Sequence, residues 1–218
     1  MVNMMNLVFS RFLLGVLLCL TSTFLFADQA IESKELITSE KVKGSGQSAQ
    51  NFVIEIISSL ESKLLEALKD GQLSDDLYLD ELINKQIFPY IDMSAITKKI
   101  TGSYWVEVIK NNDELLMQQA IKASLLRTYR IALGSYNGET IEVGESKDKP
   151  KFSLVRVTII TATNKHRLDF AVRPSNNSWL IFDVSIDGIV FTKTLRSSLK
   201  PMFEKNTVKE VIQSLTEH

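Results

Sequence analysis

Few residues in this 218-residue sequence could carry out acid–base, nucleophilic or metal chemistry. It contains two histidines, His166 and His218, and one cysteine, Cys19, which is too small a set for a transition-metal site or a thiol nucleophile. His166 and Asp169 lie three residues apart in a strand-like segment, so their side chains should project from opposite faces. They are therefore not expected to form a local acid–base pair.

Asp183 and Asp187 form the other candidate pair, because residues four apart share a face if the strand continues through both. This would be the outward face, and no nucleophile accompanies either carboxylate. An enzyme resembling nuclear transport factor, with proton transfer on a pocket carboxylate, remains an alternative, but the sequence supplies no buried acid with a raised pKa. We therefore expect no catalytic residue, no metal and no cofactor.

Composition describes a globular chain. It is 44% hydrophobic and 23% charged, which suffices for one domain with a substantial core. The formal net charge of −1 provides no basic stripe of the kind that nucleic acids require. Nucleic acid is therefore not an expected partner.

The first residues have the pattern of an export signal. Arg11 precedes the apolar run 12–26, which ends at Ala27 and is followed by polar residues. We expect cleavage after Ala27. An uncleaved anchor is disfavoured because about fifteen apolar residues fall short of the ~20 that cross a bilayer. A lipoprotein attached through Cys19 is disfavoured because a large residue, leucine, precedes it.

Three parts of the chain are expected on this basis. Residues 1–27 are a cleaved signal peptide, 28–49 a flexible polar tether and 50–218 a single domain. Cleavage removes the only cysteine, so the mature chain needs no disulfide in an oxidising compartment.

Helical patterns dominate the first half of the domain. One helix is expected to begin after Ser48 and to stop at Gly71. A second is capped by Ser74 and ends or bends at Pro89. A long third helix begins behind an Asn112 cap and stops at residue 134.

Strand patterns follow, so the fold class is α+β. Val, Ile, Thr and Phe are enriched in four runs that predict a four-stranded antiparallel meander, at residues 140–143, 151–163, 166–173 and 178–185. After the Asp187-Gly188 break, two helices are expected at 190–203 and 208–215. Alternation places Leu180 inward on the last strand and Trp179 outward.

Three motifs resemble those of one family. Phe182-Asp183-Val184-x-x-Asp187-Gly188-Ile189 resembles the Tyr-Asp-Val-x-x-Glu-Gly-Val signature of MlaC-like periplasmic phospholipid-binding proteins, the toluene-tolerance auxiliary family. Glu81-Leu82-x-x-x-x-Ile87-x-Pro89-Tyr90-x-Asp92 and Gly102-x-Tyr104-Trp105 resemble two further family motifs. The order and spacing of all three are more specific than any one alone. The similarity spans roughly residues 50 to 205.

The resemblance implies a helical N-terminal half wrapped against a strongly curved four-stranded antiparallel sheet, with C-terminal helices, enclosing an apolar cavity for acyl chains. It also implies a monomeric periplasmic carrier that moves phospholipids between outer and inner membranes and maintains outer-membrane lipid asymmetry. The implied partners are phospholipid, an inner-membrane lipid ABC transporter with a lipid-binding ring, and an outer-membrane lipoprotein complex.

Two other interpretations stay open, namely a ligand-free periplasmic adaptor and an ordinary solid core between sheet and helices. The expected lipid-binding residues combine inward strand positions with positions on the long helix, in the Gly-x-Tyr-Trp motif and after Gly188. They are Tyr104, Tyr129, Leu133, Val155, Val157, Ile159, Leu168, Phe170, Val172, Phe182, Val184, Ile186 and Val190.

Overall fold

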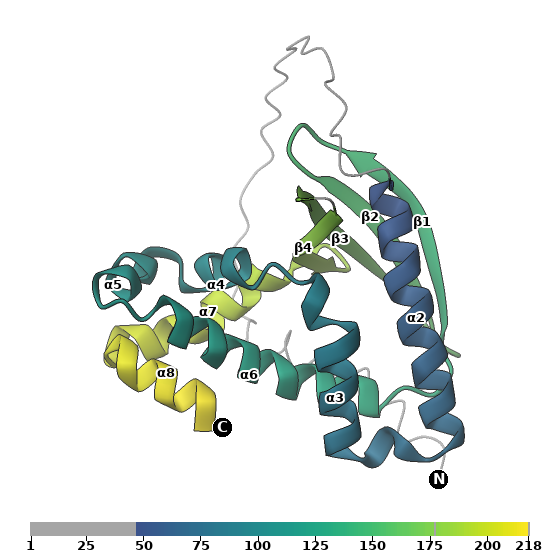
Figure 1. Cartoon of the computed structure of the whole chain (residues 1–218), viewed down its shortest axis with the longest axis horizontal. Coiled ribbons are helices and arrows are strands. Elements are labelled where there is room, and N and C mark those ends of the chain that lie inside the picture. Colours follow the sequence, from purple (N-terminus) through teal and green to yellow (C-terminus); the bar gives the residue numbers. More distant parts are fainter. Residues whose placement is uncertain (1–46, 177, 218) are drawn as a thin grey trace. The chain divides into compact units, whose positions relative to one another are not determined.

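The computed structural model of this chain describes residues 47–176 and 178–217. The chain divides into two units, Met1–Lys41 and Val42–His218, and all described residues belong to the second. The expected signal peptide, 1–27, and nearly all of the expected tether, 28–49, lie outside the described residues. The coloured ribbon in Figure 1 traces the described helices and strands of the second unit.

The first two helices form close to where the sequence predicts them. Helix α2 (Ala49–Lys69) begins behind Ser48, whose hydroxyl accepts a hydrogen bond from the Asn51 N–H. Helix α3 (Asp76–Gln86) is capped by Asp75, not by Ser74 as predicted. The reason is that Ser74 belongs to a 3₁₀ turn, while the Asp75 carboxylate accepts hydrogen bonds from two N–H groups of the first turn.

Two short helices between α3 and the long helix were not predicted. They are α4 (Met93–Thr101) and α5 (Trp105–Lys110), and the Asp92 carboxylate caps α4 by accepting from the Ala95 N–H. The predicted long helix is confirmed as α6 (Glu114–Gly134), although Asp113 and not Asn112 is the residue at its N-cap. The last two predicted helices are confirmed as α7 (Phe191–Lys205) and α8 (Val208–Glu217).

The predicted meander is also confirmed. Its strands are β1 (Thr140–Asp148), β2 (Ser153–Ile160), β3 (Lys165–Ser175) and β4 (Ser178–Ile186), and a fifth strand, β5 (Ile189–Val190), follows as a two-residue edge. The order is β1-β2-β3-β4-β5, with every neighbouring pair antiparallel. Strand β1 runs beyond the predicted residue 143 because pairing resumes at Ser146 after an irregularity that contains Gly144.

A second irregularity, in β4, overturns part of the predicted alternation. Ala171 pairs with Asp183, but the next residue of β3, Val172, pairs with Ile181, so Phe182 is an extra residue. Trp179 therefore lies on the inner face, 3% exposed, and its prediction as outward was wrong. A single inserted residue reverses the faces of all positions before it.

The Asp187-Gly188 break is a tight turn between β4 and β5. Both residues have positive φ angles, 50° and 88°, as a two-residue hairpin turn of this hand requires. Strand β4 ends at Ile186, so Asp187 does not share a strand face with Asp183, contrary to the prediction that depended on the strand continuing. The Asp187 carboxylate instead accepts a hydrogen bond from the Arg167 N–H at 2.8 Å.

Asp183, from the Phe-Asp-Val motif, joins the sheet to two helices. Its carboxylate accepts hydrogen bonds from the Thr192 hydroxyl of α7 at 2.7 Å and from the Lys99 ammonium of α4 at 2.8 Å. The residue is 7% exposed, so these partners replace the water it would otherwise bind. The motif carboxylate is therefore a structural junction.

Replacing Asp183 by alanine should lower the free energy of unfolding by about 3 kcal/mol, because the change leaves Lys99 and the start of α7 without their partner. Urea unfolding followed by circular dichroism measures this. Removing Glu66, whose pairing with Lys63 lies on the surface, should have no measurable effect. Equal stabilities for the two variants would contradict the assigned role of Asp183.

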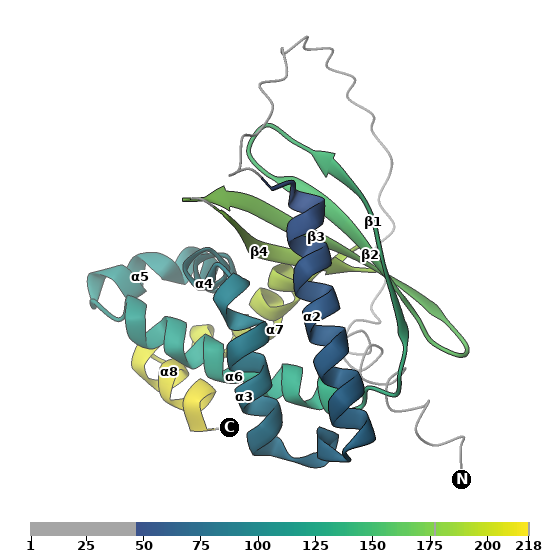
Figure 2. The same ribbon diagram turned by 45° about the vertical axis from the view of Figure 1, so that its right-hand side comes forward.

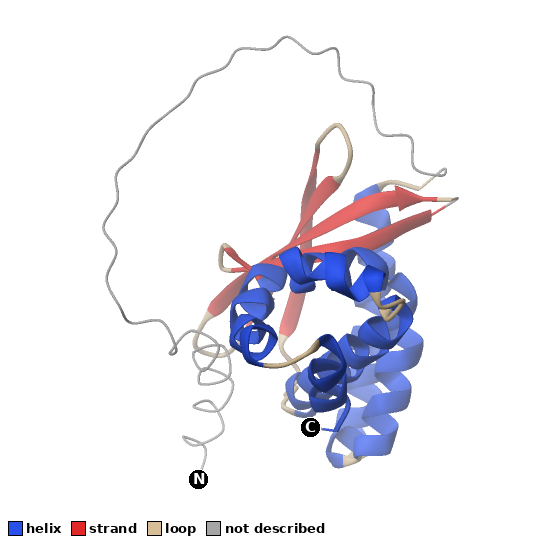
Figure 3. Cartoon of the chain, turned by 90° about the vertical axis from the view of Figure 1, so that its left-hand side faces the viewer, coloured by secondary structure: helices blue, strands red, loops and turns tan. Residues whose placement is uncertain are grey.

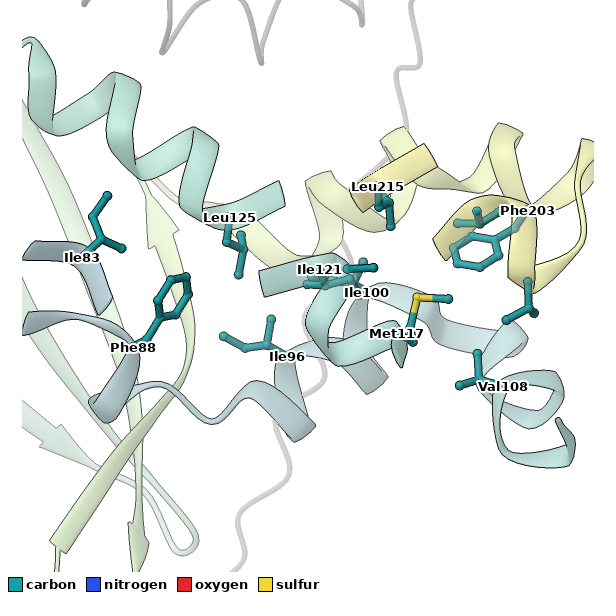
Figure 4. Packing of buried hydrophobic residues seen from close by; sticks show 13 residues of the cluster. Ile83, Phe88, Ile96, Ile100, Val108, Met117, Ile121, Leu125, Phe203 and Leu215 are labelled. Carbon is teal, nitrogen blue, oxygen red and sulfur yellow. The ribbon is translucent and has the colours of Figure 1, made fainter. Parts of the chain in front are cut away.

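The buried apolar residues form three clusters. Helices α4, α6, α7 and α8 share the largest, which includes Ile96, Met117 and Phe203 (Figure 4). A second lies between α2 and the inner face of the sheet, and a third joins α2 and α3. The helices gather on one side of the sheet, with α2 across β1 and β2 (Figures 2 and 3).

Candidate functional site

The inner face of the sheet carries two apolar rows that run across three strands. Val155 of β2, Phe170 of β3 and Val184 of β4 form one row by direct pairing, and Val157, Leu168 and Ile186 form the next. Six of the thirteen predicted site residues are therefore brought side by side. Alternation along β2, β3 and the last residues of β4 located them correctly.

Helix α2 covers only part of this face. Val155, Val157 and Val172 are at most 1% exposed and pack with Phe52 and Ile56 of α2. The structure therefore places these three predicted site residues inside the cluster that α2 forms with the sheet. Contact of these residues with lipid stays a prediction.

The rest of the face is covered less. We call Leu168, Phe170, Val184 and Ile186 the inner strip; all four side chains are only half-buried. Helix α2 packs on β1 and β2, and α4 and α7 pack on β4, while within residues 47–176 and 178–217 no helix packs on β3 to a similar extent. Leu168 and Phe170 of β3 lie at the margin of the cluster that α2 forms with the sheet. Val184 and Ile186 belong to none of the three described clusters. The inner strip is an apolar surface without a complete cover of protein.

The helices present half-buried apolar side chains of their own. Tyr129 and Leu133 lie one turn apart on α6, and Leu133 packs against both the largest cluster and the α2–α3 cluster. Helix α7 adds Leu195 and Leu199, which were not predicted as site residues. Their spacing of four, which continues from Phe191, could have identified that apolar face.

Tyr129 is the titratable group with the largest perturbation. Burial raises the pKa of Tyr129 to about 12, and its ring lies 6.1 Å from that of Phe88. Its side chain is nevertheless half-buried by surface accessibility.

This pKa predicts a pH dependence of stability. The folded-state pKa lies above the ordinary value near 10, so the native protein holds this proton where the unfolded chain releases it. The free energy of unfolding should fall by about 1.4 kcal/mol per pH unit between pH 10 and 12. Below pH 10 the phenol is protonated in both states, so Tyr129 should add no pH dependence there. In urea unfolding between pH 10 and 12, Tyr129→Phe should lack the part of this pH dependence that Tyr129 causes. A variant whose free energy of unfolding falls with pH as steeply as that of wild type would contradict the prediction.

The remaining predicted site residues lie elsewhere. Tyr104 stacks on Phe203 with ring centroids 4.7 Å apart, within the helical cluster. Phe182 lies against Phe152, ring centroids 5.7 Å apart, and under the Lys99 ammonium. Because the β4 irregularity turns it toward Lys99 and away from Val184, its inward assignment was wrong, and so was that of Leu180, which pairs with Arg173.

Ile159 borders the inner strip, whereas Val190 does not. Val190 lies in β5 and pairs with Ser185 of β4, which alternates with Val184 and Ile186, so it lies on the opposite face of the sheet. Ile159 pairs with His166 at the end of the sheet that also holds Ile186. Both side chains are half-buried.

The structure pairs His166 with Asp187, which the sequence did not indicate. The His166 Nδ1 atom lies 3.1 Å from the Asp187 carboxylate. Burial by itself would raise the pKa of that carboxyl, but hydrogen bonds from the Arg167 N–H and the His166 ring leave the pKa below its ordinary value. The pair holds the β4–β5 turn against β3, and a carboxylate that ionises this readily is a weak general base.

The described part of the chain offers neither a metal site nor a membrane span. No group of three or more His, Cys, Asp or Glu side chains in residues 47–176 and 178–217 could hold a metal ion. None of the helices described there is long and apolar enough to cross a membrane.

Comparisons with known proteins agree with this geometry. The family model described as "MlaC protein" matches residues 58–217. A solved phospholipid-binding protein from Ralstonia solanacearum, determined in complex with a phospholipid, superposes with a TM-score of 0.69 at 22% sequence identity. The match covers 78% of this chain and 96% of that one, so the two share a fold. A comparison with curated proteins gave no match.

Proposed function

The chain belongs to the MlaC family. We propose that it is a phospholipid carrier and that the acyl chains of the bound phospholipid lie on the inner strip. The observation that carries the proposal is the inner strip itself: four apolar side chains on the inner face of the sheet that stay half-buried, two of which, Val184 and Ile186, pack in none of the described clusters. Acyl chains would supply the missing cover. The expected apolar cavity is part of this proposal.

One feature supports a cavity within the domain. The buried apolar residues are divided among three clusters. A domain of this size with a solid core usually has one contiguous cluster. The proposed lipid contacts are the inner strip, Tyr129 and Leu133, with Ile159 at the border of the strip.

The nature of the ligand is indicated by the same apolar chemistry. The solved neighbour is a phospholipid-binding protein, which supports the same class of ligand here. Two long acyl chains contain about 30 CH₂ groups, and removing each from water is favourable by ~0.8 kcal/mol, so burying both chains in the protein is favourable by roughly 24 kcal/mol. Burying them in a bilayer is favourable by nearly the same free energy. That balance suits a carrier that loads at one membrane and unloads at another.

Family membership also supports a location and partners. We propose that the protein is a monomer in the periplasm. Its proposed partners are an inner-membrane ABC transporter that bears a lipid-binding ring and an outer-membrane lipoprotein complex. By exchanging lipid with both, it would maintain outer-membrane lipid asymmetry and toluene tolerance. Lipid should then move between protein and liposomes faster when those complexes are present. An unchanged rate would exclude them as partners.

Export is a separate proposal. Mature protein is expected to begin at Asp28, because the apolar run after Arg11 ends at Ala27. Sequencing the N-terminus of protein from the periplasmic fraction tests this. Full-length chain that begins at Met1 in the membrane pellet would contradict it.

The alternatives are a ligand-free adaptor and an enzyme. Organic extraction of purified protein separates them from a carrier, because only a carrier is expected to release stoichiometric phospholipid. The control is protein denatured and refolded in detergent-free buffer before extraction. An extract of the native protein without phospholipid would reject the carrier function.

A further inference from the structure

Helix α7 has two contrasting faces. Phe191, Leu195 and Leu199 pack into the helical cluster, while the opposite face is exposed and basic. Helix α4 packs beside α7 and adds another exposed lysine. We call these exposed cations the basic face: Lys98, Lys193, Arg196, Lys200 and Lys205.

Acidic residues scarcely offset this charge. Along α4 and α7 the only acidic residue is Glu204, whose carboxylate lies 3.4 Å from the Lys200 ammonium. The Arg196 guanidinium donates to the Lys99 carbonyl, which fixes its position without neutralising it. The basic face is thus strongly positive in a chain with a formal net charge of −1.

An exposed apolar group lies along the chain directly after α4. Residues of α5 and of the first turn of α6 form an apolar tip: Val106, Ile109, Leu115 and Leu116, with exposed fractions of 73%, 47%, 66% and 50%. Helix α5 lies next to α4 in the same part of the fold (Figures 1 and 2). Lys110, at the end of α5, is also exposed, and Glu107 and Glu114 are the acids nearby in sequence.

We propose that the basic face and the apolar tip together bind the surface of an anionic phospholipid bilayer. Cations attract anionic headgroups, and aliphatic side chains that protrude beside them can enter the headgroup region. This surface is distinct from the inner strip, and its binding does not require bound cargo. It would hold the carrier at a membrane before any exchange of lipid.

Composition favours a bilayer over an acidic protein as the occupant. Four of the five cations on the basic face are lysines, and lysine is depleted in specific protein interfaces, where arginine and aromatic residues are enriched. The apolar tip contains only aliphatic side chains. A laterally mobile anionic surface needs no fixed partner for each lysine.

Vesicle flotation tests the proposal with wild type, two triple lysine variants and one double variant of the apolar tip. The first triple variant is Lys98→Gln/Lys193→Gln/Lys200→Gln. The second, a control with the same change in net charge at exposed lysines elsewhere, is Lys69→Gln/Lys147→Gln/Lys165→Gln. Vesicles are phosphatidylcholine alone or with one-third phosphatidylglycerol.

Wild type should bind the phosphatidylglycerol vesicles, and the first triple variant should bind them roughly 100-fold more weakly, since each cation near an anionic surface contributes about fivefold. The control should bind as wild type does. Val106→Ser/Leu115→Ser should weaken binding at least about tenfold. All variants should keep their phospholipid by native mass spectrometry, which separates this proposal from the carrier function.

Three results would overturn the proposal. One is equal binding of wild type to both kinds of vesicle, and another is equal loss of binding in both triple variants. The third is that wild type binds no vesicles, while the first triple variant binds a membrane protein complex more weakly than wild type does. That result would make the basic face a docking site for a protein.

Discussion

Replacing Val184 by glutamate is expected to empty the protein of phospholipid while leaving it folded. Val184 is half-buried, lies beside Phe170 on the inner strip, and belongs to none of the described clusters. A carboxylate placed among acyl chains costs several kcal/mol, enough to lower lipid affinity more than about 100-fold. Without lipid, the carboxylate can meet water in the proposed cavity.

Phospholipid per protein in organic extracts and the cooperativity of thermal melting should be measured together. Val184→Leu is the matched control, because it keeps the strip apolar and should retain lipid. Normal lipid content in Val184→Glu would show that the inner strip is not the site. A variant that cannot fold would favour a solid core.

Replacing Val157 by glutamate is expected to prevent folding. Val157 is 1% exposed and packs in the cluster that α2 forms with the sheet. The side chains of that cluster offer no cation to pair with a carboxylate, so burial of the charge costs several kcal/mol. That is a large share of the roughly 5–15 kcal/mol that typically stabilises a domain.

The expected observation is loss of the cooperative melt and of near-ultraviolet circular dichroism. Val157→Ala should melt cooperatively at a lower temperature, because it leaves a cavity without burying a charge. A Val157→Glu protein that melts like wild type would mean that α2 does not seal this part of the sheet.

Val157 and Val184 show what alternation could establish and what it could not. Both were correctly assigned to the inner face from the period-two pattern. Whether a helix covers a given position depends on where α2 crosses the sheet. That crossing is a tertiary property, which the pattern of one strand does not contain.

Trp179 and Phe182 were misassigned for another reason. The extra residue in β4 leaves no mark in composition, because Phe182 and its neighbours are all suitable strand residues. Only the register with β3 reveals that the faces exchange between Phe182 and Asp183. The short helices α4 and α5 were missed because their few apolar positions give little periodic signal.

Where local signals are strong, sequence and structure agree. Ser48 caps α2, and Gly188 completes the turn that the Asp-Gly pair predicts. The family motifs proved largely structural in their roles: Asp183 joins β4 to α4 and α7, and Tyr104 stacks on Phe203.

Native mass spectrometry of the intact protein tests the carrier function most directly. The protein, purified without detergent, should appear as a monomer carrying the mass of a bound phospholipid, and activation in the gas phase should release that lipid. Val184→Glu should appear at the mass of the polypeptide alone. A wild-type protein seen only at the polypeptide mass, under conditions in which it remains folded, would contradict the proposal that the inner strip holds phospholipid.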